Sequence, residues 1–326
     1  MEPKSSTHQQ AILQLLERAR LPQKEVEIRL EKAWNPSYWR ALNPQLSIDS
    51  GAAPETLERV SLDVSELQTL RSKYGQEGFF QTQPILDPST LERLRECVEI
   101  LRRENWPPVF AFVYDELWLA TRTRSVVRLL GHILGQGYKQ TSHVWCHYVR
   151  EGRGEGGWPP HVDGHREEKR VTVWIPLSDA TLDNGCIYVV PRDLVSREIA
   201  NGFLNMPTIS SADASALLQS SRALPAPAGS ILGWDYTLIH WGSKCGWPGN
   251  PRISIAVTFI ASDTEPTKRE PPLLDGSGTP PNFAQRLHLI GKGIQTYQKR
   301  EPLMIRYQEI AQRLLQQSET VGNHLA

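Results

Sequence analysis

The feature that most constrains the fold is a change of hydrophobic period at Tyr138. From there to Ile260 apolar and polar residues alternate in short runs, with turn residues between the runs. In the first run, His143, Trp145 and His147 would share one face of a strand. Further strands are expected around His161, near residues 169–177, 186–191 and 229–232, around 240, and at 252–260. Many short strands of this kind are typical of an antiparallel barrel or a double-sheet jelly roll.

Helical patterns lie on both sides of these strands. Apolar residues recur at helical spacing over 9–39, with a division at Pro22, and again over 54–74. Asp87 and Pro88 are a favourable start for a helix that should run to about residue 104. Another helix is expected over 125–134, and a helical tail follows a Pro-rich loop beyond 263. We therefore expect a mainly β fold with N- and C-terminal helices packed around it.

Composition excludes several classes of partner. Lys and Arg number 36, as do Asp and Glu, and this balance favours neither nucleic acid nor an acidic membrane surface. No apolar stretch reaches membrane-spanning length, and no signal peptide is recognisable. The four scattered cysteines are expected to be buried free thiols in a reducing compartment. A cytoplasmic protein is the resulting expectation.

His161 and Asp163 form a His-X-Asp pair that could supply two ligands to one metal ion. On a strand, residues two apart point to the same face. A third ligand could come from His240, at the end of another short apolar run. Two histidines and one carboxylate form the facial triad of non-haem Fe(II) oxygenases. The pair alone is also compatible with two solvated loop residues, because short motifs occur by chance.

Arg252 gives independent support for a binding site. It shares a strand face with Ser254, while the opposite face of 252–260 is aliphatic. If that aliphatic face lies against helices, Arg252 points into the barrel and requires an anionic partner, such as a dicarboxylate held by a bidentate pair. An exposed arginine at a strand edge is the alternative.

Taken together, residues 78–260 resemble the phytanoyl-CoA hydroxylase-like (PhyH) family of Fe(II)- and 2-oxoglutarate-dependent oxygenases. The order and spacing of the matching segments carry the resemblance: Gly78-Phe79-Phe80 and the helix after Asp87, His161-Val162-Asp163, Trp174-Ile175-Pro176-Leu177-Ser178-Asp179-Ala180, Asn184-Gly185-Cys186, Gly229-Ser230, His240 and Pro251-Arg252-Ile253-Ser254.

The resemblance implies a cupin-like jelly roll, the double-stranded β-helix, at residues 76–262. An N-terminal helical extension would occupy residues 1–75, and a Pro-rich loop and helical tail would occupy 263–326. Within the core, the implied Fe(II) ligands are His161, Asp163 and His240. Arg252 and Ser254 would hold the distal carboxylate of 2-oxoglutarate.

Trp174 resembles the family's cosubstrate-pocket tryptophan. His147 or His143 would also touch the cosubstrate, at positions where the family more often has amides, or would simply be core histidines. A second departure is Pro191-Arg192-Asp193, where many members have Pro-Gly-Ser-His.

The implied reaction is oxidation of a small organic substrate by O2, with release of succinate and CO2. The family's halogenating members replace the carboxylate ligand, so an intact Asp163 favours hydroxylation of a C–H bond in a lipid, acyl compound or secondary metabolite. Residues 151–157 and 192–223 are expected to close the pocket, with Phe203, Leu204 and Met206 lining it, or to be surface loops. Either helical flank could form the face of a homodimer.

Two other functions remain open from the sequence. A cupin-like isomerase or hydrolase could use Zn(II) on the same ligands with an activated water. Such an enzyme would have no need for Arg252 and Trp174 as a dicarboxylate clamp. A non-catalytic binding protein of the same fold is the other alternative, and the intact ligand set argues against it.

Overall fold

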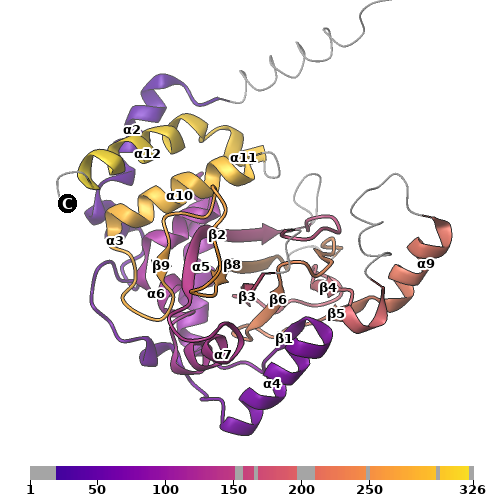
Figure 1. The fold of residues 1–326 in the computed structure, drawn as a ribbon. Helices are drawn as coiled ribbons and strands as arrows, with labels where there is room; N and C mark the ends of the chain where they lie inside the picture. The colour runs from indigo at the N-terminus through magenta and orange to yellow at the C-terminus, as the bar shows by residue number, and fades with distance from the viewer. Residues whose placement is uncertain are drawn as a thin grey trace, which may run out of the picture.

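Two antiparallel β-sheets face each other at the centre of the protein (Figure 1). The computed structural model describes residues 20–150, 157–164, 168–196, 210–246, 250–298 and 302–322. The six-stranded sheet has the order β1-β6-β3-β8-β2-β9, and the three-stranded sheet has the order β5-β4-β7. The strands are β1 (Phe79–Gln81), β2 (Lys139–Val149), β3 (Arg170–Pro176), β4 (Ile187–Val189), β5 (Arg222–Leu224), β6 (Leu232–Asp235), β7 (His240–Gly242), β8 (Arg252–Ile260) and β9 (Leu274–Asp275).

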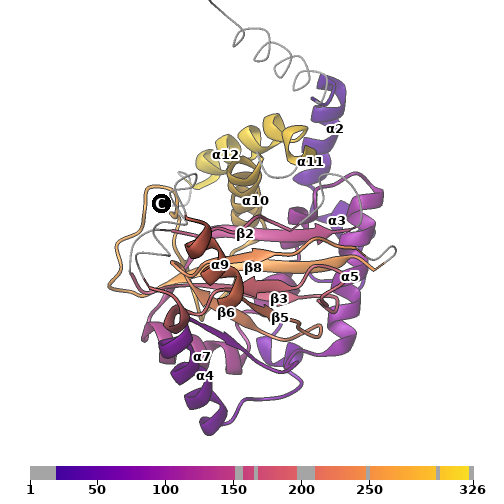
Figure 2. The ribbon, with the colours of Figure 1, turned by 90° about the vertical axis from the view of Figure 1, so that its right-hand side faces the viewer.

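Helices cover the outside of the larger sheet and its two edges. The helices of the described residues are α2 (Gln23–Ala33), α3 (Pro36–Leu42), η1 (Pro54–Leu57), α4 (Val64–Glu77), α5 (Pro88–Arg103), η2 (Pro108–Val113), α6 (Asp115–Leu119), α7 (Arg124–Leu134), η3 (Arg192–Leu194), α9 (Ser211–Ser220), α10 (Phe283–Tyr297), α11 (Pro302–Ile305) and α12 (Gln308–Gly322). Helix α9 differs from the others in lying beside the smaller sheet (Figure 1). In Figures 1 and 2, α10 and α12 lie on the side of the sheet where β2 is, and in Figure 1 α4 lies beside β1 at the opposite edge. The fold is thus a jelly roll with helical flanks, as predicted.

In β2 and β8 successive side chains point to opposite faces of the sheet. One face packs in the main core, and the other faces the space between the two sheets. Val144 pairs with Val257 and Trp145 with Ala256 in this antiparallel ladder. The aliphatic face of β8 belongs to the main core, which also includes residues of α5, η2 and α10. The opposite face, which begins at Arg252, therefore turns toward the smaller sheet. Arg252 is buried, so it is not an exposed edge arginine.

The two helical flanks meet each other and share the main core. Trp39 of α3 and Tyr307, just before α12, both pack against Trp106 and Phe110. Rings at these separations form one aromatic cluster. The flanks consequently belong to the same folded unit as the sheet they cover.

Some predicted elements differ from the structure. The expected helix over 54–74 is broken, because Asp63 accepts a hydrogen bond from the Glu66 amide in a capping box that starts α4. The strand expected at 229–232 begins at Leu232, since Gly229 has φ +81° in a turn. His161 lies on no strand and makes a single bridge to His240. Pro36 starts a separate helix, α3, within the first predicted helical region.

The four cysteines are buried free thiols, as expected. Residues 9–19 of the first predicted helix lie outside the described residues. So do 151–156 of the Gly-rich loop and 197–209 of the insertion, including Phe203, Leu204 and Met206. Within the described part of the chain, the structure contains no helix with the length and hydropathy that crossing a bilayer requires.

Candidate metal and cosubstrate site

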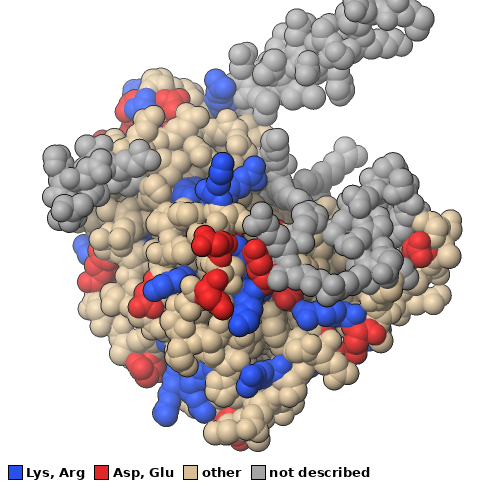
Figure 3. All heavy atoms as spheres, in the orientation of Figure 1, with Lys and Arg blue, Asp and Glu red and all other residues tan. Residues whose placement is uncertain are grey.

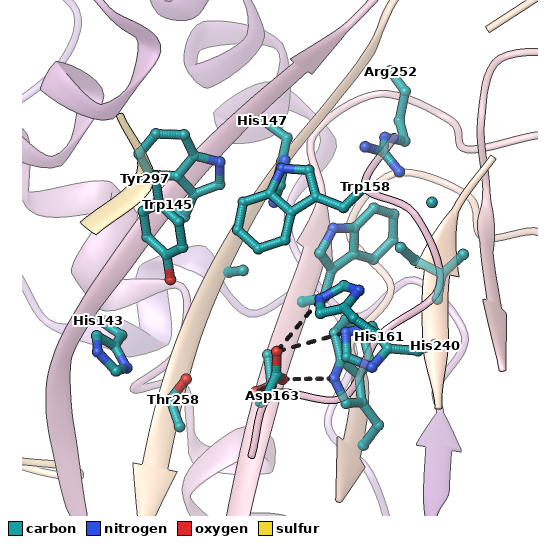
Figure 4. A pocket seen from close by; sticks show the side chains of 16 residues that line it. His143, Trp145, His147, Trp158, His161, Asp163, His240, Arg252, Thr258 and Tyr297 are labelled. Atoms are coloured by element: carbon teal, nitrogen blue, oxygen red, sulfur yellow. Dashed lines mark hydrogen bonds and ion pairs between the residues drawn. The ribbon is translucent and has the colours of Figure 1, made fainter. Parts of the chain in front are cut away.

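One pocket lies between the two sheets and contains most of the predicted site residues. Its walls come from β2, β3 and β8 on one side and from β4 and β7 on the other (Figure 4). His161, Asp163 and His240 line it, together with Trp174 and Arg252. Residues from four distant segments of the sequence therefore meet here.

The two histidines are joined through their backbones. His161 N donates to His240 O at 3.0 Å, and His240 N donates to His161 O at 2.9 Å. The next such contact is a hydrogen bond of 3.0 Å from Gly164 N to Tyr236 O. These bonds hold the 161–164 segment alongside the start of β7 and bring the two imidazoles to a centroid separation of 4.3 Å.

Hydrogen bonds at Nδ1 orient both imidazole rings. His161 Nδ1 lies 2.8 Å from Pro159 O, and His240 Nδ1 lies 2.9 Å from Leu238 O. A carbonyl oxygen only accepts, so Nδ1 carries the proton in each ring. Each Nε2 is then the atom with a lone pair, which is the tautomer that metal-binding histidines require.

Asp163 uses its two carboxylate oxygens differently. Oδ2 accepts hydrogen bonds from Thr172 Oγ1 at 2.6 Å and Trp234 Nε1 at 3.1 Å. Oδ1 lies 3.7 Å from Nε2 of each histidine. Burial alone would raise the pKa of Asp163, but the electrostatic influence of His240 and His161 and the two hydrogen bonds bring this pKa below its ordinary value.

The three ligand atoms lie within 4.8 Å of one another, which leaves room for one ion among them. Metal–ligand bonds to nitrogen and oxygen are about 2.1 Å long, so ligand atoms at neighbouring positions lie roughly 3 Å apart. A small inward adjustment of the side chains would complete such a site. The donor set, two imidazoles and one carboxylate, fits Fe(II).

Arg252 lies at the other end of the pocket (Figure 4), and Trp174 lies beside it. The Arg252 guanidinium lies 5.6 Å from the Trp174 ring centroid, and its Nη1 donates to Gly185 O at 2.6 Å. Among the described residues, Trp174 Nε1 and Ser254 Oγ have no hydrogen-bond partner although both atoms are buried. Buried polar atoms rarely lack partners, so these two atoms fit a ligand with oxygen acceptors, such as a carboxylate.

His147 and His143 both project from β2 toward the pocket. His147 lies opposite Ser254 in the ladder, close to the arginine end. Burial, with the charge on Arg252, holds the pKa of His147 well below its ordinary value, so the ring is neutral. His143 lies at the far end of the pocket in Figure 4. Of the two, His147 has the position expected of a cosubstrate contact.

Sequence reasoning missed several residues of this pocket. Thr172 could have been found, because it shares a face of β3 with Trp174, two residues away. Trp234 also donates to the Asp163 carboxylate, but nothing in the sequence around Trp234 indicates this role. Thr258 lies on the same β8 face as Arg252. Tyr297 is the last residue of α10 and enters the pocket from outside the predicted core.

A jelly roll with two histidines and a carboxylate between its sheets defines a class of proteins related to the cupins. The sequence matches the family model described as phytanoyl-CoA dioxygenase (PhyH) over residues 46–244, more than half of the chain. The chain belongs to this family. No curated protein sequence matches it.

Solved structures support the fold assignment. The apo form of a non-haem monooxygenase, ThoJ, is 14% identical with a TM-score of 0.52, covering 73% of this chain and 99% of the other. The nickel complex of ThoJ is 16% identical with a TM-score of 0.51, covering 71% and 98%. SnoN, a non-haem alpha-ketoglutarate-dependent epimerase from nogalamycin biosynthesis, is 17% identical with a TM-score of 0.50, covering 67% and 93%.

These findings confirm the predicted family and fold class. They agree with iron and 2-oxoglutarate as the cofactors of an oxygenase of this family, and the His161, Asp163 and His240 group could hold the metal. The epimerase among the similar structures shows that this fold serves more than one reaction. Arg252 and Ser254 lie beyond the segment that the family model matches.

Proposed function

We propose that the protein is a non-haem Fe(II)- and 2-oxoglutarate-dependent dioxygenase that hydroxylates an unactivated C–H bond of a small organic substrate. O2 would be the co-reactant, and succinate and CO2 would be released. The observation that carries the proposal is that His161, Asp163 and His240 share one pocket with Arg252 and Trp174. The His161, Asp163 and His240 group alone would be compatible with many metal-dependent reactions. Arg252 and Trp174 add a place where a dicarboxylate can bind.

In this proposal each metal ligand is held by a partner of its own. The carbonyl oxygens of Pro159 and Leu238 keep the two Nε2 atoms directed at the ion. The bonds to Oδ2 of Asp163 leave Oδ1 for the metal. Bound iron and 2-oxoglutarate would supply the activation of O2, and the protein would supply binding and orientation.

The arginine end would hold the distal carboxylate of 2-oxoglutarate. Arg252 is 1% exposed, and a buried guanidinium forms strong charge-assisted hydrogen bonds with a carboxylate. Ser254 Oγ and Trp174 Nε1 are the additional donors, and neutral His147 lies beside them. A Zn(II) hydrolase would have no use for this combination of buried donors.

The proposal extends to partners and location. We infer a cytoplasmic protein that acts on small molecules rather than on nucleic acid or a membrane. Basic and acidic side chains are interspersed on the face shown in Figure 3, and the formal net charge is zero. We also propose that the protein forms a homodimer. The chain would divide at residues 75/76 and 262/263 into an N-terminal helical extension, the oxygenase core and a C-terminal tail.

An anaerobic titration with Fe(II) and 2-oxoglutarate tests this function. We expect the visible charge-transfer band of an iron–2-oxoglutarate chelate in the wild-type protein. His161→Ala should abolish the band and Arg252→Ala should weaken it, whereas His132→Ala on α7 and Arg222→Ala on β5, both outside the pocket, should leave it unchanged.

The outcome also separates the alternatives. Tight metal binding without a band would contradict the oxygenase proposal and favour the Zn(II) isomerase or hydrolase. Absence of metal binding would favour a binding protein. If the band forms, succinate release with a panel of substrates, and the gain of one oxygen atom in the product by mass spectrometry, would distinguish hydroxylation from epimerisation.

A further inference from the structure

The end of the pocket away from Arg252 forms a second binding region. Its walls are His143 and Trp145 of β2, Thr258 of β8 and Tyr297 of α10 (Figure 4). The candidate metal ligands His161, Asp163 and His240 line the same pocket. Because the proposed cosubstrate occupies the arginine end, this second region is where a substrate would meet the metal.

Aromatic rings make up one wall of the region. The Trp145 and Tyr297 centroids are 4.3 Å apart, and Trp158 lies 5.1 Å from Tyr297. Trp158 in turn lies 5.5 Å from the ring of His161. A flat molecule held against this wall is therefore next to the metal ligands. Aromatic side chains prefer offset or edge contacts with another π-system.

The position of Tyr297 depends on a close approach of α10 to β2. Gly293 lies one helical turn before Tyr297, and a Cβ atom at Gly293 would lie 3.1 Å from Val144 O. Since residues four apart share a helix face, the contact that brings Gly293 to Val144 also directs Tyr297 at the neighbouring Trp145. Helix α10 lies outside the segment that the family model matches. Tyr297 is therefore contributed by a segment that the family model does not match, whereas Trp145 and Trp158 lie within the matched segment.

The region also offers a buried hydrogen-bond donor. Trp145 is 1% exposed, and its Nε1 has no hydrogen-bond partner among the described residues. Buried indole N–H groups usually have a partner. In Figure 4 the nitrogen lies on the edge of the ring that turns toward His147, inside the pocket. The pocket thus combines flat apolar surfaces with a donor that a ligand oxygen could satisfy.

We infer that the substrate is a planar, ring-bearing molecule with a hydroxyl or carbonyl oxygen. Its ring lies against Tyr297, Trp145 and Trp158, and its oxygen accepts a hydrogen bond from Trp145 Nε1. The inference rests on the proposed function for the reaction, and on the pocket alone for the binding. Tyr297 is then a residue that determines specificity, with no part in holding iron or 2-oxoglutarate.

Calorimetry with two matched probes tests this. The protein is loaded anaerobically with Fe(II) and 2-oxoglutarate and titrated with 2-naphthol or with 2-decalol, its saturated counterpart. We expect one 2-naphthol per chain, bound roughly tenfold more tightly than 2-decalol. Tyr297→Leu should weaken 2-naphthol by about five- to tenfold and leave 2-decalol within about twofold, while Tyr297→Phe keeps the preference.

Two further variants complete the design. Tyr188→Leu removes a tyrosine that also stacks on a tryptophan, Trp241, but lies outside the pocket, and should change nothing. Trp145→Phe keeps a ring, removes the N–H, and should weaken 2-naphthol by roughly three- to tenfold. An unchanged chelate band in each variant would show that the fold and the metal site are intact.

The outcomes distinguish this inference from the proposed function. Absence of 2-naphthol binding, equal binding of the two probes, or equal effects of Tyr297→Leu and Tyr188→Leu would overturn the inference, and a chelate band would leave the oxygenase standing. A preference for 2-naphthol that depends on Tyr297, without any chelate band, would support the binding region and overturn the proposed function.

Discussion

Replacing Thr172 by valine tests how the structure orients the carboxylate ligand. Thr172 Oγ1 donates to Asp163 Oδ2 at 2.6 Å, and Trp234 Nε1 donates to the same oxygen at 3.1 Å. Valine keeps the shape of threonine and removes the hydroxyl. Asp163 would then be held by one donor instead of two, and its Oδ1 would be less firmly directed at the two imidazoles.

The expected loss of Fe(II) affinity follows from the negative charge on the Asp163 carboxylate, which accepts the hydrogen bond. Hydrogen bonds to charged groups contribute about 1.5–3 kcal/mol, and about 1.4 kcal/mol corresponds to a factor of ten in affinity. Because the Trp234 bond remains, we expect Fe(II) affinity to fall by about tenfold, at the lower end of the 10–100-fold range for partners of metal ligands. The measurement is an anaerobic competition between the protein and a chromogenic Fe(II) chelator.

The pairing of β3 with β8 provides a matched control for Thr172→Val. Thr258 lies directly opposite Thr172 in the β3–β8 pairing and also lines the pocket, but its hydroxyl has no hydrogen bond to Asp163. Thr258→Val should leave Fe(II) affinity within about twofold. Equal losses in the two variants would refute the reasoning, because the effect would then come from pocket polarity and not from orientation of Asp163.

Three further substitutions give distinct results. Arg252→Ala should weaken 2-oxoglutarate binding by about 100-fold and change Fe(II) affinity by less than about threefold, measured by titration of the chelate band. Gly164→Ala would place a Cβ atom 2.2 Å from the Tyr236 ring, so Fe(II) affinity should fall roughly tenfold and recover in the double variant with Tyr236→Ala. Burial alone would raise the pKa of Asp115, but bonds from Ser50 and the charge of Arg286, at 2.6 Å, lower it to about 2. This depressed pKa stabilises the fold by about 2 kcal/mol above about pH 4, and the stabilisation is lost as the pH falls toward 2. In urea unfolding, the difference between wild type and Asp115→Asn should therefore shrink between pH 4 and pH 2.

Elements whose signal is local were predictable from the sequence. The faces of β2 and β8 follow from a period of two, which each strand displays within its own residues. Asp87 and Pro88 likewise start α5 as expected. Residues 108–119 gave no such signal, because η2 and α6 are buried on every side and their apolar run has no period. The break before α4 was missed although its capping residues, Asp63 and Glu66, are visible in the sequence.

The site was predictable where chemistry and spacing coincide. His161 and Asp163 were recognised as candidate metal ligands because a histidine and an aspartate two residues apart can share a face, and Arg252 was recognised because the opposite face of its strand is aliphatic. The way in which His161 meets His240 was not predictable. The sequence suggested neighbouring strands, whereas the structure uses one pair of backbone hydrogen bonds between a loop and β7. Spacing indicates which side chains can share a face, but not which backbone carries them.

The pocket residues that the sequence analysis missed include one from a segment distant in the chain from the predicted ligands. Tyr297 comes from a helix that the sequence assigns to a C-terminal tail, yet α10 packs against β2 so closely that a Cβ atom at Gly293 would lie 3.1 Å from Val144 O. The aromatic cluster around Trp106 ties the N-terminal flank to the same core. In the proposed function, the jelly roll would therefore hold the metal ligands, and the flanking helix would supply part of the wall that faces them.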